Sequence, residues 1–124
     1  MKSSNECMKP PEEVLDRIGW TLYRDFQLYN ILVEAKHTKP GYKKFSELQK
    51  EMEIELIPQL ASLLRRNQID ETIKKELIKD PTEKNEKMAV YSILPKGENV
   101  LVAIKQLYKA FTGKELEYTK PTHS

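Results

Sequence analysis

The chain has 124 residues and a formal net charge of +2, with 39% hydrophobic and 32% charged residues, which suits one folded domain rather than a disordered tail. Its single cysteine, Cys7, excludes an internal disulfide framework and a cysteine-cluster zinc site, and it fits a reducing, cytoplasmic location. The four glycines are too scattered to form a phosphate-binding loop, and no apolar run approaches the roughly 20 residues that span a bilayer. No pair of a nucleophile and a base stands out in the sequence either. We therefore expect a non-enzymatic binding protein without a cofactor or metal.

The first element is predicted to be a long amphipathic helix. Residues 1–9 are polar and are expected to form a flexible arm, after which Pro10 and Pro11 suit the first turn of a helix. Apolar residues then recur at steps of three and four as far as Val33, which is the spacing of one helix face. Gly19 and Trp20 are a candidate break that would divide this stretch into a short helix and a longer one.

A basic loop and two shorter helices are expected next. Lysines crowd residues 36–44, where Pro40-Gly41 indicates a turn. Ser46 is the predicted N-cap of a short helix that continues to Met52. A further helix is predicted to carry Pro58 in its first turn and to end at Asn67, with Asn67 as a left-handed C-cap.

After Ile69 the spacing of the apolar residues changes from that of a helix to that of β-strands. Residues 72–78 and 88–93 are β-prone and flank a polar loop, which predicts a β-hairpin. The last helix is the clearest element, because its apolar residues from Val100 to Phe111 keep helical spacing and Gly113 follows them. Residues 114–124 are expected to form a flexible tail.

The expected fold class is therefore mainly α with a small β-hairpin (α+β). Three helices followed by a hairpin and a last helix have the layout of a winged helix-turn-helix. One such domain is predicted to occupy residues 10–113.

Three sequence pieces carry a resemblance to a known family. An N-terminal Cys7 precedes the helical piece 14–19, a basic loop leads into Lys-Phe-Ser-Glu-Leu at 44–48, and Tyr-Ser-Ile-Leu-Pro-Lys-Gly follows the second strand at 91–97. Together they resemble the HxlR-type winged-helix transcriptional regulators. The resemblance implies a two-fold homodimer that binds double-stranded DNA, with no membrane association.

The predicted third helix would read bases in the major groove. Its polar residues are Gln59, Ser62, Arg65 and Arg66, and glutamine and arginine side chains pair well with adenine and guanine. Basic residues also cluster in the loop before the second helix and in the hairpin, where winged helices contact phosphates. The candidate phosphate contacts are Lys43, Lys44, Lys84 and Lys87, although a solvated lysine surface would give the same pattern.

Two further features, the apolar faces of the first and last helices and the single Cys7, each allow a functional and a structural interpretation. The apolar faces of the first and last helices predict a homodimer interface, and simple core packing is the alternative. The predicted interface residues are Leu15, Ile18, Leu101, Ile104, Leu107, Tyr108 and Phe111.

Cys7 is a candidate redox sensor, and an ordinary surface thiol is the alternative. One cysteine per chain restricts an oxidised form to an intermolecular bridge or a small-thiol adduct. Mass spectrometry after diamide treatment tests this hypothesis, and a Cys7 that stays unmodified would contradict it.

A competing function is protein–protein interaction. Glu51, Glu53 and Glu55 precede the predicted third helix and would repel a phosphate backbone. The near-neutral net charge favours the same alternative, a winged helix that has lost DNA binding and serves as a docking module.

Overall fold

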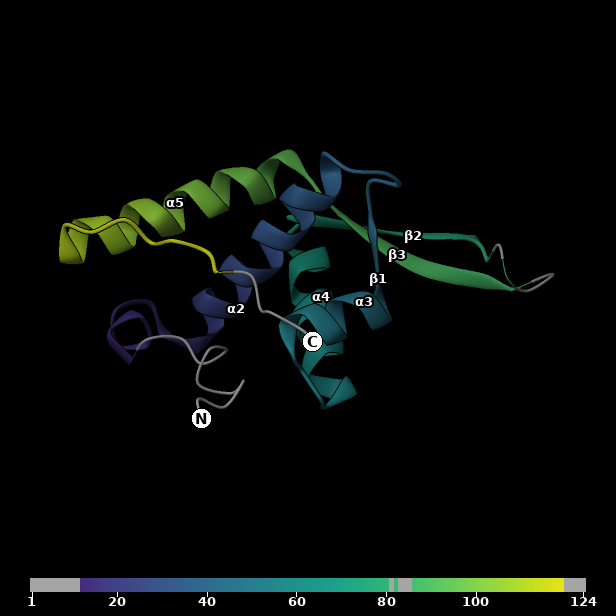
Figure 1. Cartoon of the computed structure of the whole chain (residues 1–124), viewed down its shortest axis with the longest axis horizontal. Helices are drawn as coiled ribbons and strands as arrows, with labels where there is room; N and C mark the ends of the chain where they lie inside the picture. The colour runs from purple at the N-terminus through teal and green to yellow at the C-terminus, as the bar shows by residue number, and fades with distance from the viewer. Residues whose placement is uncertain (1–11, 81, 83–85, 120–124) are drawn as a thin grey trace.

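The computed structural model describes residues 12–80, 82 and 86–119. Within these residues, four helices and three strands follow in the order helix, strand, helix, helix, strand, strand, helix (Figure 1). Their bounds are α2 Glu12–Lys36, β1 Lys43–Lys44, α3 Phe45–Met52, α4 Ile57–Ile69, β2 Ile73–Lys79, β3 Lys87–Ile93 and α5 Pro95–Thr112.

Helix α2 is the centre of the fold, and it is broken at Gly19 as predicted. Gly19 has φ 77° and ψ 169°, a conformation outside the helical region that glycine adopts at little steric cost. The part of α2 beyond the break is buried on several sides, because α3, α5 and the sheet all pack against it. Its residues Phe26, Leu28 and Leu32 are at most 1% exposed.

The segment before α3 differs from the prediction. Lys43 and Lys44 form strand β1, and α3 begins at Phe45, one residue before the predicted N-cap Ser46. Lys44 occupies the N-cap, and its backbone N–H donates to Glu47 Oε1 at 2.8 Å. The prediction of Ser46 as the cap is therefore wrong, because the glutamate three residues after Lys44 accepts the N–H that the helix start leaves unpaired.

Helix α4 begins as predicted and ends later. Pro58 lies in its first turn, but the helix continues past Asn67 to Ile69, with Asp70 as C-cap in a right-handed conformation. The residue with positive φ is Glu71, at 60°. The prediction of Asn67 as a left-handed C-cap is wrong, because its side chain is fully buried and bonded inside the domain.

The predicted hairpin is confirmed and carries an additional strand. Strands β2 and β3 pair antiparallel from Ile73↔Ile93 at the base to Lys79↔Lys87 at the far end. Strand β1 pairs with the other edge of β3, which gives the strand order β1-β3-β2. Figure 1 shows the long hairpin reaching away from the helices, which pack at the opposite end of the molecule.

Helix α5 lies along α2 and ends at Gly113 as predicted, where φ is 73°. The chain then turns back towards α2 (Figure 1). Leu116 is only 6% exposed, and the ring of Tyr118 meets that of Phe26 edge-on at 6.2 Å. This part of the expected tail therefore packs on the core, because the Leu116 side chain is buried there and the Tyr118 ring contacts Phe26. Among the described helices, none is both long enough and apolar enough to serve as a membrane span.

Candidate nucleic-acid interface

Helix α4 buries one face and exposes the other. Leu60, Leu63 and Leu64 are at most 7% exposed and hold the helix on the core. Gln59, Ser62 and Arg65 are exposed. Three of the four predicted base-reading residues are therefore accessible to a ligand along the outer side of one helix.

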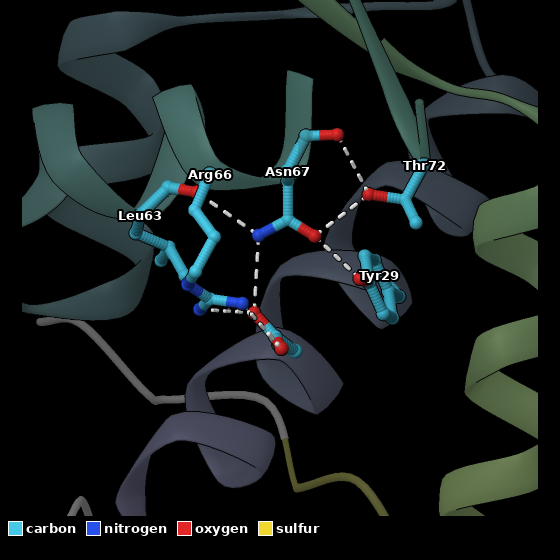
Figure 2. Close-up of polar contacts among 6 residues, drawn as sticks. Tyr29, Leu63, Arg66, Asn67 and Thr72 are labelled. Carbon is cyan, nitrogen blue, oxygen red and sulfur yellow. Dashed lines mark hydrogen bonds and ion pairs between the residues drawn. The ribbon is translucent and has the colours of Figure 1, made fainter. Parts of the chain in front are cut away.

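A buried polar network attaches α4 to α2 and to Thr72, the residue before β2 (Figure 2). The Asn67 amide lies at its centre, where Nδ2 donates to Asp25 Oδ1 and to the Leu63 carbonyl, both at 3.0 Å. The amide oxygen accepts a bond from Thr72 Oγ1 at 2.7 Å and a second from the Tyr29 hydroxyl. Because unpaired polar groups are costly to bury, this arrangement favours one position of α4 relative to its neighbours.

The fourth predicted base-reading residue belongs to this network. The Arg66 guanidinium donates Nη2 to Asp25 Oδ1 at 2.7 Å and Nη1 to Oδ2 at 3.0 Å. The Asp25 side chain is 5% exposed and that of Arg66 is 41% exposed. The hydrogen bond to this carboxylate raises the pKa of the Arg66 guanidinium above its usual value. The charge of Arg66 thus compensates Asp25, whereas Arg65 forms no ion pair within the described residues.

The predicted phosphate-contacting lysines lie in different environments. Lys43 Nζ forms an ion pair with Glu51 Oε2 at 2.7 Å, and its side chain is 24% exposed. Lys44 and Lys87 are exposed, whereas Lys84 lies outside the described residues. Lys44 and Lys87 are therefore accessible to a phosphate, while the charge of Lys43 is already balanced.

The sheet register reveals lysines that the sequence analysis did not single out. Lys79 pairs with Lys87 and Lys75 with Tyr91, and side chains two apart along a strand share a face. Lys75, Lys79 and Lys87 therefore lie on one face of the hairpin and are exposed. The alternation along β2 was the signal in the sequence that could have found them.

A groove of about 510 Å³ lies between the first half of α2 and α4. Arg24 on its wall stacks over the Trp20 ring, with Cζ 5.5 Å from the ring centroid. Arg24 Nη1 donates to Gln27 Oε1 at 2.8 Å and to the Met52 carbonyl at 3.0 Å. Burial lowers the pKa of this guanidinium from its usual value. The lining residues are Trp20, Thr21, Arg24, Ile54, Gln59, Ser62, Leu63 and Arg66.

The predicted dimer residues divide into two groups. Ile18, Leu101, Ile104 and Tyr108 are at most 8% exposed within the single chain, so they belong to its own core. The remaining residues are more accessible: Leu15 is half-buried, Leu107 is 40% exposed and Phe111 is 57% exposed. The candidate sensor Cys7 lies outside the described residues.

Solved structures share this fold. No family model and no curated protein matches the chain. A PadR family transcription regulator from hypervirulent Clostridium difficile is similar, with 16% identity, a TM-score of 0.56, and coverage of 73% of this chain and 92% of that chain.

Two more transcriptional regulators are similar. The reduced form of YodB from B. subtilis has 18% identity and a TM-score of 0.52, and the match covers 90% of each chain. The regulator PA4135 has 18% identity and a TM-score of 0.55, with coverage of 80% of this chain and 65% of that chain. The predicted α+β winged helix-turn-helix fold is confirmed.

Proposed function

We propose that this protein is a transcriptional regulator that binds double-stranded DNA. The observation that carries the proposal is the exposed polar side of α4, with Gln59, Ser62 and Arg65, in a domain whose hairpin carries three accessible lysines on one face. The three similar solved structures described above are transcriptional regulators, which supports the same function. The finer resemblance to the HxlR type rests on residues 44–48 and 91–97.

In this proposal α4 enters the major groove. Gln59 and Ser62 offer an amide and a hydroxyl to base edges, and Arg65 offers a guanidinium that suits guanine or phosphate. Arg66 acts as a positioning residue, because its guanidinium holds the Asp25 carboxylate and thereby fixes α4. Lys75, Lys79 and Lys87 on the hairpin would contact the backbone, together with Lys44 at the start of α3.

We expect Arg65→Ala to weaken DNA binding about tenfold or more, since one arginine contact contributes about 1–3 kcal/mol. The measurement is fluorescence anisotropy against duplexes selected from a random-sequence pool, at low and at physiological salt. Arg17→Ala is the matched control, because Arg17 is an exposed arginine on another helix.

Arg65→Ala should also leave thermal stability unchanged. The Arg66→Ala variant is unsuitable here because it would leave the buried Asp25 carboxylate without its cation. Equal affinities for Arg65→Ala and wild-type protein would contradict the role of α4. No duplex bound even at low salt would contradict the function itself.

We also propose a homodimer formed through the exposed apolar side of α5. Leu107 and Phe111 lie one turn apart on that side and are accessible in the single chain. Phe111→Glu should give a folded monomer, because a buried carboxylate would oppose association. Light scattering at micromolar concentration checks this, with the exposed Gln106→Glu on the same helix as control. A monomeric wild-type protein would contradict the proposal.

A second candidate function is protein docking, and the start of α4 favours it. Leu56 and Ile57 are each 59% exposed there, next to the acidic residues Glu53 and Glu55. Salt dependence separates the two functions, since phosphate contacts weaken steeply as salt rises. A docking module would show no DNA affinity at any salt concentration.

A further inference from the structure

The start of helix α4 exposes apolar side chains where a helix usually carries polar ones. Leu56 occupies the N-cap and forms no side-chain cap hydrogen bond, and Ile57 is the first residue of the helix. Each is 59% exposed. Serine, threonine, aspartate and asparagine are the preferred N-cap residues, and leucine is among the least favoured there. Helix stability therefore gives no reason for Leu56, and neither side chain contributes much to the core.

The backbone around this apolar pair is held in place by hydrogen bonds. The Leu56 carbonyl accepts the Gln59 N–H at 3.0 Å. One residue earlier, the Glu55 carbonyl accepts a bond from Gln49 Nε2 at 3.1 Å. Ile54, which precedes them, is only 4% exposed and attaches the segment to the core. The pair is therefore presented in a fixed position, and it loses little conformational freedom when a ligand binds.

The outer side of α4 is neutral over its first two turns. Gln59, Ala61 and Ser62 follow the apolar pair and are exposed. Helix α4 contains no acidic residue along its whole length, and its first basic residue is Arg65. The first half of the helix therefore offers a ligand apolar groups, one amide and one hydroxyl, rather than the row of cations that phosphates attract.

These groups suit the major-groove edge of A·T base pairs. Thymine carries its C5-methyl group there, which takes apolar contacts, and adenine pairs through N6 and N7 with the amide of a glutamine. The N-terminal residues of a reading helix are the ones that contact base edges. We propose that the start of α4 reads A·T base pairs, with Leu56 and Ile57 against thymine methyl groups and Gln59 on adenine. This inference rests on the proposed function and names the base pairs that α4 would select.

The acidic residues before α4 agree with a position over the bases. Glu55 is exposed directly before Leu56, and Glu53 lies two residues further back. Their carboxylates repel phosphates, which border the groove on both sides. The start of α4 is therefore better suited to the middle of the groove, where the base edges lie, than to the DNA backbone.

The test compares duplexes that differ only in the thymine methyl group. Duplexes that bind the full chain are selected from a random-sequence pool and then remade with deoxyuridine in place of thymine, which keeps the base pairing and removes the methyl. We expect the selected sites to be rich in A·T pairs. The deoxyuridine duplex should bind about tenfold more weakly in fluorescence anisotropy, since each of two buried methyl groups contributes about fourfold. Equal affinity for both duplexes would overturn the proposal.

Variants of the apolar pair make the test specific to α4. The double variant Leu56→Ala/Ile57→Ala should bind the two duplexes with affinities within about twofold of each other, and Ile57→Ala alone should give an intermediate ratio. Ile69→Ala is the matched control, because Ile69 is 70% exposed at the other end of the same helix, and it should keep the wild-type ratio. A structural role of the pair would weaken both duplexes equally. An unchanged ratio in the double variant would therefore overturn the assignment.

The outcomes separate this inference from the proposed function. If a selected duplex binds and the methyl groups make no difference, the regulator proposal stands and the assignment of A·T base pairs fails. If no duplex binds even at low salt, both proposals fail, and the apolar pair suits the protein partner of a docking module instead.

Discussion

The Asn67→Ala variant is expected to lose about 3–5 kcal/mol of unfolding free energy, because it removes four hydrogen bonds at a fully buried position. The truncation leaves the Tyr29 and Thr72 hydroxyls without their side-chain acceptor. It also removes one of the donors to the Asp25 carboxylate, which is 4% exposed as a residue. Denaturant unfolding monitored by circular dichroism measures the loss, and the melting temperature should fall by roughly 10 °C or more.

The neighbouring Gln68→Ala is the matched control for this variant. Gln68 lies on the same helix, is half-buried and makes one side-chain bond to the Leu64 carbonyl. We expect a loss of less than about 1 kcal/mol, since water replaces that bond. Similar losses for the two variants would show that the buried network adds nothing to the attachment of α4. The folded fraction of Asn67→Ala should also bind DNA less well, because this network orients the proposed reading helix.

The second large effect is expected for Gly97→Ala, at about 3 kcal/mol of destabilisation. A Cβ at this position would lie 2.3 Å from the Thr72 carbonyl oxygen and 2.9 Å from Ile93 Cγ1. The Thr72 carbonyl cannot easily retreat, since it accepts the Leu94 N–H at 3.0 Å. Alanine normally stabilises a helix by about 1 kcal/mol relative to glycine, so the close approach of α5 to the backbone before β2 reverses the usual sign.

Gly113→Ala separates this steric effect from the general effect of glycine. A Cβ at Gly113 meets nothing within 4 Å, and the only cost comes from its φ of 73°. About 1 kcal/mol is expected there, from placing a side chain in the left-handed region. Chemical denaturation of both variants checks the difference, and a Gly97→Ala protein as stable as Gly113→Ala would contradict the packing argument.

The sequence by itself determined the elements whose signals are local. The helical spacing of apolar residues in α2 and α5, the break at Gly19 and the stop at Gly113 all come from backbone preferences within a few residues. The hairpin was equally readable, because two β-prone runs flank a polar loop. The exposure of Gln59, Ser62 and Arg65 follows from the same period, since the leucines of α4 define its buried face.

Only the tertiary structure decided which partners those elements find. Strand β1 has two residues and is a strand only because β3 offers an edge to pair with. Asn67 resembles a helix end in the local sequence, yet Asp25 lies 42 residues before it and the Tyr29 hydroxyl 38 residues before it. The Arg66 guanidinium is likewise paired with Asp25 across 41 residues, whereas Arg65 has no ion-pair partner among the described residues. Local periodicity fixes where a side chain points, but its hydrogen-bond partner depends on which distant segment the packing brings alongside.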